Sequence, residues 1–213
     1  MKKFILPLLV VGALMAAPAQ AQKIDAKPTK AVKAKGNAPY QVQPQLSTLG
    51  WLGKKVGGQH NGTVALKDGQ VQVKGNQIVG GTFTFDMNSI KVEDLTDPGY
   101  NAKLVGHLKN DDFFAADKYP TATFVITSVK PIKADANGNN AQIAGNLTIK
   151  GKTHPVTFPA KVGVKDGVAA ASGVATVDRT KYDVKYGSTL FGAAADKAIE
   201  DNFTLSFNVV AKQ

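Results

Sequence analysis

The side chains that could carry chemistry in this chain are few, and a single arginine is the most distinctive of them. The chain contains 26 lysine and arginine residues, and the only arginine is Arg179, in the run TVDRTKYDVKYGS at 176–188. A guanidinium is a planar, multidentate donor that a lysine ammonium does not replace. The alternation along this run places Arg179 on the same strand face as Val177, so both point inward if Val177 does.

A buried Arg179 needs a partner, because an unpaired charge in a protein interior costs several kcal/mol. The sequence leaves two kinds of partner open. One is a carboxylate from Asp86, Asp111 or Asp112, which would pin a loop against the body of the fold. The other is the polar head group of a bound ligand.

The three histidines give little support to catalysis or to metal binding. His60, His107 and His154 lie in different predicted elements, with no carboxylate or second histidine at metal-ligand spacing. The motifs of zinc proteases, serine hydrolases and phosphate-binding loops do not occur in the sequence. We therefore predict no catalytic residue, no metal and no cofactor. An enzyme with His60 and an aspartate as acid and base rests on residue types alone.

The N-terminus predicts export. A basic start at 1–3 precedes an apolar run at 4–17 and the small-residue pattern Ala19-Gln20-Ala21. This order is typical of a secretory signal peptide. Residues 1–21 are therefore expected to be removed, which leaves a periplasmic or secreted protein. The chain has no cysteine, so disulfides cannot stabilise it and a lipoprotein anchor is excluded.

The stretch that follows, 22–38, is rich in lysine and poor in apolar residues. It holds five lysines and one aspartate, within a chain whose formal net charge is +10. Such a composition predicts a disordered tail. The tail is expected to aid solubility or to make a weak contact with a membrane surface. Nucleic-acid binding is not expected, because the body has no basic cluster interleaved with aromatic residues.

From residue 40 onward the dominant pattern is the alternation of apolar and polar residues, as in GTFTFDM at 81–87 and NFTLSFNVV at 202–210. A period of two predicts strands with one face in a core. Turn signals separate these strands at 67–69, 74–76, 137–139, 150–151 and 165–167. The expected strands cover 40–55, 61–73, 77–87, 120–130, 141–150, 153–164, 168–179 and 201–211.

One stretch, 94–114, predicts a helix. Asp97 suits the N-cap and Pro98 the first helical position, and Tyr100, Leu104 and Leu108 share one face. This helix is expected to cap one end of the fold. A second irregular stretch, 186–202, is expected to form a long loop or short helix near the other rim.

The pattern indicates an all-β fold of successive antiparallel hairpins, closed as a barrel or packed as a sandwich. A barrel of about eight strands holds either packed side chains or one small ligand. The strand GVAAASGVATV at 167–177 is filled with small residues. These residues either leave space inside the barrel or compensate for bulky neighbours across it.

Six blocks of sequence occur in an order that identifies a family resemblance: HNGTV (60–64), GGTFTFDMNSI (80–90), LVGHLKNDDFF (104–114), YPTATF (119–124), GNLTIKG (145–151) and VDRTKYDVKYGS (177–188). Together they resemble the YceI family of lipocalin-like, polyisoprenoid-binding exported proteins. The resemblance covers about residues 39–211, so 39–213 is expected to be one YceI-like β-barrel domain. Asp183 is a departure, since many relatives have glycine there.

The resemblance implies an extended eight-stranded antiparallel lipocalin-like barrel with one helix near a barrel end. It also implies a periplasmic or secreted carrier that holds an isoprenoid lipid, such as a quinone tail or polyprenyl chain, in an apolar tunnel. The alternative is an envelope stress-associated interaction protein with a packed barrel and no lipid cargo. The oligomeric state is left open, a dimer included. Alternation and motif position together predict the ligand-binding residues Trp51, His60, Phe83, Phe85, Phe113, Phe114, Phe124, Phe158, Arg179, Tyr182, Phe203 and Phe207.

Overall fold

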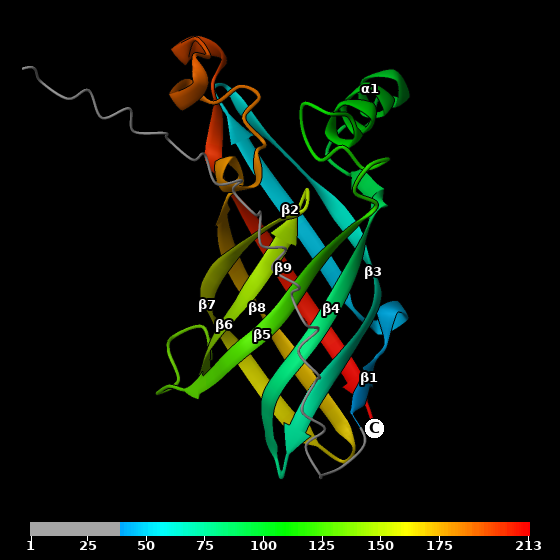
Figure 1. Ribbon diagram of the computed structural model, residues 1–213, viewed down its shortest axis with the longest axis vertical. Coiled ribbons are helices and arrows are strands. Elements are labelled where there is room, and N and C mark those ends of the chain that lie inside the picture. Colours follow the sequence, from blue (N-terminus) through cyan, green and yellow to red (C-terminus); the bar gives the residue numbers. More distant parts are fainter. Residues whose placement is uncertain (1–38) are drawn as a thin grey trace, which may run out of the picture. The chain divides into compact units, whose positions relative to one another are not determined.

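The alternating segments form one antiparallel sheet that closes on itself as a barrel (Figure 1). The computed structural model describes residues 39–213; the expected signal peptide and lysine-rich tail lie outside them. The ring runs β2-β3-β4-β5-β6-β7-β8-β9 and returns to β2. This confirms the eight-stranded barrel. The elements are β1 (Tyr40–Val42), β2 (Thr48–Lys55), β3 (Gly58–Lys74), β4 (Gln77–Val92), α1 (Pro98–Lys109), β5 (Thr121–Pro131), β6 (Ala141–Ile149), β7 (Lys152–Lys165), β8 (Val168–Asp178) and β9 (Ile199–Lys212).

The first predicted strand, 40–55, is interrupted by a short 3-10 turn at Pro44–Leu46. Proline has no N–H to donate to a ladder, so the strand breaks at this point. The Ser47 hydroxyl repairs the break by donating to the Gln43 carbonyl at 2.8 Å and accepting from the Val210 N–H at 3.1 Å. The segments β1 and β2 therefore share one place in the barrel, between β3 and β9.

The run at 67–69 is not the turn that the sequence suggested. It lies inside the continuous strand β3, where the pairing with β4 shifts register between Leu66 and Asp68. The shift changes which residues face inward, from Val64 and Leu66 before it to Val71 after it. A bulge bends and twists a strand, and here it allows one 17-residue strand to follow the curved wall.

The helix α1 forms where the sequence predicted it. The Asp97 carboxylate accepts a hydrogen bond from the Tyr100 N–H at 2.9 Å, and Pro98 occupies the first position. The segment 183–198 contains two 3-10 turns, Thr189–Phe191 and Ala195–Lys197, before β9 begins at Ile199. The sequence predicts the irregular stretch 186–202 near the opposite rim. Both projections instead extend from the same end of the barrel (Figure 1), which is called the helix end below.

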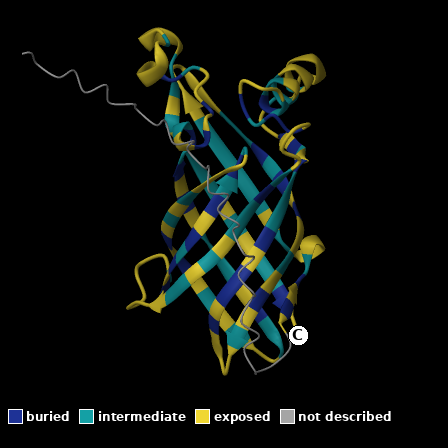
Figure 2. Cartoon of the chain, in the orientation of Figure 1, coloured by how far each residue is buried: buried dark blue, intermediate teal, exposed yellow. Residues whose placement is uncertain are grey.

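The opposite end of the barrel is closed by packed side chains. Tyr40, Val42, Val71, Ile78 and Ala211 are buried together there, and further apolar residues pack against them. Along the barrel wall, buried and exposed residues alternate, as Figure 2 shows. No helix among residues 39–213 is long and apolar enough to cross a membrane.

Candidate functional site

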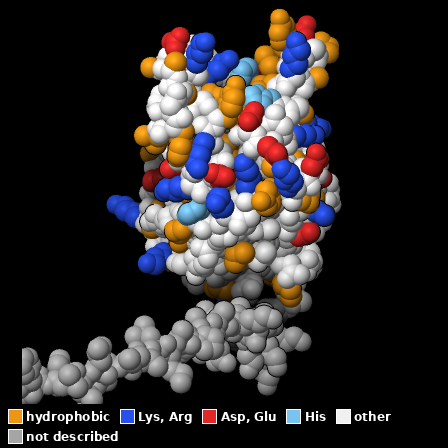
Figure 3. Space-filling model, turned by 45° about the horizontal axis from the view of Figure 1, so that its top comes forward, with side chains coloured by type: hydrophobic (Ala, Val, Ile, Leu, Met, Phe, Trp, Pro, Cys, Tyr) orange, Lys and Arg blue, Asp and Glu red, His pale blue; other side chains and the backbone are white. Residues whose placement is uncertain are grey.

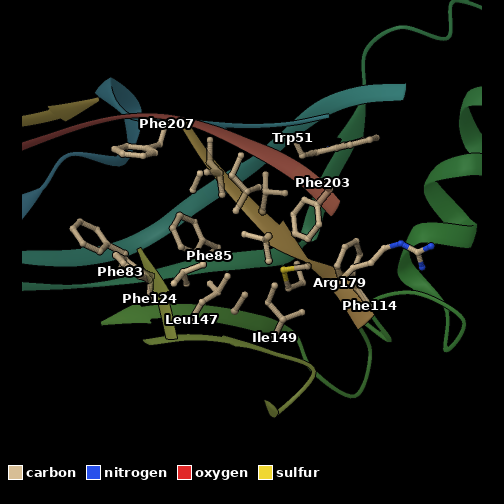
Figure 4. Close-up of a pocket in the computed structure, with 18 of the residues that line it drawn as sticks. Trp51, Phe83, Phe85, Phe114, Phe124, Leu147, Ile149, Arg179, Phe203 and Phe207 are labelled. Atoms are coloured by element: carbon tan, nitrogen blue, oxygen red, sulfur yellow. The ribbon is translucent and has the colours of Figure 1, made fainter. Parts of the chain in front are cut away.

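The inward faces of the strands enclose an apolar cavity (Figure 4). The volume of this cavity is about 200 Å³. The surface exposed to this cavity is entirely apolar. The lining reaches the helix end at Val184, Ile199 and the exposed Glu200; the other exposed lining residue, Thr48, lies where β2 begins.

Ten of the twelve predicted ligand-binding residues line this cavity. Their side chains come from β2, β4, β5, β7, the loop after α1, the end of β8 and β9. The ten are Trp51, Phe83, Phe85, Phe113, Phe114, Phe124, Phe158, Arg179, Phe203 and Phe207. Whether they contact a ligand remains a prediction.

A row of aromatic rings lies along the wall in the part of the cavity away from the helix end. The Phe124 ring centroid lies 6.4 Å from that of Phe83 and 5.6 Å from that of Phe158, which lies 5.4 Å from that of Phe207. Rings at these separations pack as in a protein core. On β9, however, the inward residues Phe203 and Phe207 are only half-buried, because they border unfilled space.

The small residues of β8 serve both purposes that the sequence left open. A side chain at Gly173 would lie 2.9 Å from the Phe207 ring, so this glycine makes room for a bulky neighbour. Ala171 and Ala175 line the cavity and leave it wider. Gly53 on β2 has the same effect, since a side chain there would meet nothing within 4 Å.

His60, which the sequence predicts to bind the ligand, does not line the cavity. Its Nδ1 lies 2.7 Å from Asp94 Oδ2, in a partly exposed pair above the end of β4. The backbone N–H of Asn61 donates to the same carboxylate at 2.9 Å. Burial raises the pKa of Asp94, but the hydrogen bonds from Asn61 and His60 outweigh it and lower the pKa below its ordinary value.

Tyr182 is also absent from the lining. It is buried in the core at the helix end, 2% exposed, with its ring edge-to-face against His154 at a centroid distance of 5.2 Å. Burial raises the pKa of the Tyr182 phenol to about 12, because the phenolate would be poorly solvated there. Tyr182 is therefore a packing residue between β7 and the turn that follows β8.

Arg179 contacts none of the carboxylates proposed for it. The strand β8 ends at Asp178, and Arg179 opens a 3-10 turn. This turn ends at Asp183 in the left-handed conformation, with φ of 62°, a conformation that suits the glycine of many relatives. The Arg179 stem borders the cavity, while the guanidinium points away from the aromatic side chains (Figure 4).

The Arg179 guanidinium instead binds four backbone carbonyls. Nη1 donates to Val184 and Tyr186 at 2.8 Å each, Nη2 to Ile199 at 3.0 Å and Nε to Glu200 at 2.9 Å. The carbonyls of Val184 and Tyr186 lie at the start of the segment 183–198, and those of Ile199 and Glu200 lie at the start of β9, directly after it. We call these two stretches the legs of the segment. Arg179 therefore fastens the base of this segment to the barrel wall.

Charge balance at Arg179 comes from an aspartate that the sequence analysis missed. Asp201 Oδ1 lies 3.5 Å from Arg179 Nη2, and Arg179 is only 4% exposed. Burial lowers the pKa of Arg179, and Asp201 and Asp178 oppose that shift. Nothing in the alternation pointed to Asp201, since its role depends on where the segment 183–198 returns to the wall.

Other cavity residues could have been predicted from the sequence. Leu147, Ile149 and Val156 line the cavity and carry the same alternation as the predicted aromatics. Leu49, Val64 and Met87 also contribute. Among the described residues, no group of three or more histidine, cysteine or acidic side chains is arranged to hold a metal ion.

A closed eight-stranded antiparallel barrel around an apolar cavity defines a lipocalin-like barrel, a class whose interior has room for one small ligand. Within that class, a family match assigns the chain to one family. The family model of the YceI-like domain matches residues 40–211, and the chain belongs to this family.

The curated relatives match over a shorter stretch. A UPF0312 protein of Pseudomonas aeruginosa is 43% identical over 89 residues, which cover 38% of this chain and 44% of the relative. Protein YceI of Escherichia coli O157:H7 is 37% identical over 89 residues, with the same shares covered. The match therefore spans less than half the length of these relatives.

Solved structures match over most of the barrel. BcnA of Burkholderia cenocepacia is 28% identical with a TM-score of 0.59, covering 80% of this chain and 99% of that one. A domain of Saccharophagus degradans described as polyisoprenoid-binding is 14% identical with a TM-score of 0.58, covering 81% and 97%. At that identity the second match shows a shared fold.

Proposed function

We propose that this protein binds an isoprenoid lipid, with a quinone tail or polyprenyl chain held in the barrel cavity. It carries this lipid in the periplasm or as a secreted protein and catalyses no reaction. The observation that carries the proposal is the unfilled, wholly apolar cavity inside a closed barrel. The name of the Saccharophagus degradans domain supports the same ligand class.

Burial of an isoprenoid tail supplies ample affinity. Each buried CH₂ contributes roughly 0.8 kcal/mol, so one five-carbon unit contributes about 4 kcal/mol. Non-covalent affinities level off near roughly −20 kcal/mol, and ordering a flexible chain offsets part of the gain. The lining therefore needs no polar contact to hold the tail, and its branched and aromatic side chains suit a methyl-branched hydrocarbon.

The two other functions have less support. A packed barrel acting as an interaction protein without cargo requires side chains that meet across the interior, whereas this interior is unfilled. An acid–base role for His60 requires the His60–Asp94 pair to face the bound lipid, whereas neither residue lines the cavity.

The direct test is organic extraction of the protein purified from its native source, followed by mass spectrometry. We expect an isoprenoid lipid at a stoichiometry near one per barrel. Protein that releases no lipid and takes up no added quinone would contradict the proposal.

A pair of glycines allows a matched test of the cavity itself. Gly53 lines the cavity and Gly163 faces outward on β7, and a side chain at either position would meet nothing within 4 Å. Gly53→Phe is expected to reduce the retained lipid at least several-fold without loss of folded structure. Gly163→Phe is expected to leave the lipid content unchanged. Equal lipid content in the two variants would exclude the cavity as the binding site.

A further inference from the structure

The helix end carries the three most exposed large apolar side chains of the described residues, those of Leu190, Tyr100 and Val56. Leu190 is 75% exposed and Phe191 51%, both in the 3-10 turn of the segment 183–198, and Tyr100 on α1 is 66% exposed. Val56, in the turn between β2 and β3, is 56% exposed, and its N–H donates to the Ala198 carbonyl beside the same segment. Three of these apolar residues therefore lie on the two projections, and Val56 lies in the turn that contacts one of them. We call these four residues the apolar tips.

Lysines accompany the aromatic residues of the apolar tips. Lys185 Nζ lies 4.9 Å from the centre of the Phe191 ring, and Lys103 Nζ lies 5.6 Å from the centre of the Tyr100 ring. A lysine beside an exposed aromatic ring suits a membrane–water interface, where the ring enters the head-group layer and the ammonium stays at its surface. Figure 3 shows hydrophobic and lysine side chains together on both projections.

The charge around the apolar tips is nearly balanced. Lys54, Lys55 and Lys197 are exposed there in addition to Lys103 and Lys185. The carboxylates at the same tips are those of Asp97, Asp183, Asp196 and Glu200, and Asp183 pairs with Lys185 at 2.7 Å. The helix end therefore has little net charge with which to attract anionic lipids.

The segment 183–198 cannot easily fold its apolar turn inward. Arg179 holds both of its legs through the carbonyls of Val184, Tyr186, Ile199 and Glu200. At the other projection, the His107 ring packs edge-on against the Tyr186 ring at a centroid distance of 4.6 Å. These contacts hold the bases of both projections at the rim of the barrel while their apolar tips remain exposed.

The lining of the cavity reaches the rim of the barrel at the bases of these projections. Its lining includes Val184 and Ile199 at the base of the segment 183–198, and Phe113 and Phe114 in the loop after α1. We propose that the apolar tips dock onto a lipid bilayer and bring the cavity mouth against the membrane surface. A hydrophobic cargo then passes between bilayer and cavity without crossing water.

Co-sedimentation with vesicles of phosphatidylethanolamine and phosphatidylglycerol at three to one tests this proposal, using the protein from Gln22 onward. Leu190→Ser/Phe191→Ser is expected to lower the vesicle partition coefficient at least tenfold, since burial of one side chain of this size contributes roughly a factor of ten or more. The matched control is Val125→Ser/Val174→Ser on the barrel wall, where these residues are 41% and 54% exposed. The control is expected to stay within twofold of the unaltered protein.

Because the chain has no cysteine, one introduced thiol locates the contact. A polarity-sensitive dye on Leu190→Cys is expected to brighten and shift to the blue on addition of vesicles, whereas the same dye on Val174→Cys is expected not to respond. Absence of vesicle binding, an equal loss in the control pair, or an equal response of both dyes would overturn the proposal. A docking face for a protein partner would give the first of these results. The vesicle partition coefficient and the dye response are both independent of the lipid content of the barrel.

Discussion

Replacement of Arg179 by lysine is expected to lower stability and to leave lipid binding intact. The guanidinium makes four hydrogen bonds to buried or partly buried carbonyls, and an ammonium at the end of a lysine stem cannot span both legs of the segment 183–198. If two bonds are lost at roughly 1.5 kcal/mol each, the free energy of unfolding falls by about 3 kcal/mol. For a domain of this size, that corresponds to a decrease in Tm of about 6–12 °C.

Thermal unfolding followed by circular dichroism measures the loss, and limited trypsin digestion localises it. We expect Arg179→Lys to speed cleavage after Lys185 and Lys197, which lie in the released segment. Lys181→Ala, an exposed change in the same 3-10 turn, is the control and is expected to shift the free energy of unfolding by less than about 0.5 kcal/mol. An unchanged Tm would refute the role of Arg179 as a fastener. Loss of lipid without loss of stability would instead make the guanidinium a ligand contact.

Three further predictions concern stability: one tests backbone packing at a glycine, and two test the pH dependence of the free energy of unfolding. Gly62→Ala is expected to destabilise the fold by about 1–3 kcal/mol, because the new Cβ would overlap the Lys91 carbonyl, whereas Gly163→Ala, in open space, is expected to be neutral in chemical denaturation. The raised pKa of Tyr182 favours the neutral phenol in the folded state. Its contribution to the free energy of unfolding, about 2–3 kcal/mol, is therefore complete below pH 10 and is lost as the pH rises through about 12. Tyr182→Phe should flatten that part of the pH–stability curve, and an unaltered curve would count against burial of the phenol. The lowered pKa of Asp94 stabilises the fold at pH values above the ordinary carboxyl range. This contribution, no more than about 1 kcal/mol, is lost as the pH falls through the lowered pKa. Asp94→Asn should remove this loss of stability at acid pH, and if the loss persists in the variant, other carboxyl groups cause it.

The barrel was predictable because its strands alternate clearly. In strands such as β4 and β9, large apolar residues recur at every second position, and these residues line the cavity as expected: Phe83, Phe85, Met87, Phe203, Leu205 and Phe207. The alternation fails at bulges and breaks. The run at 67–69 resembles a turn in composition, yet the pairing of Asp68 with Thr84 and of Gly69 with Phe83 on β4 keeps it within β3. Tertiary pairing decides such positions, and a local pattern cannot report it.

The polar part of the site was harder to predict for a related reason. His60 was assigned to ligand binding by motif position. Its ring instead forms a hydrogen bond with Asp94, which is 34 residues away in the sequence. Tyr182 was assigned to ligand binding from the same motif as Arg179, but the 3-10 turn after Asp178 rotates it into the core. In both cases the residue type was informative, whereas the side-chain direction depended on a contact distant in sequence or on the end of a strand.

The presence of one arginine in a lysine-rich chain follows from the geometry of the segment 183–198. Its two legs leave the sheet at the helix end and bring four carbonyls, those of residues 184, 186, 199 and 200, around one point. Buried carbonyls without donors destabilise a fold. A guanidinium offers five N–H donors in a fixed plane, whereas an ammonium offers three that radiate from one atom. The position therefore requires arginine for its donor geometry, and its positive charge is the part that Asp201 has to balance.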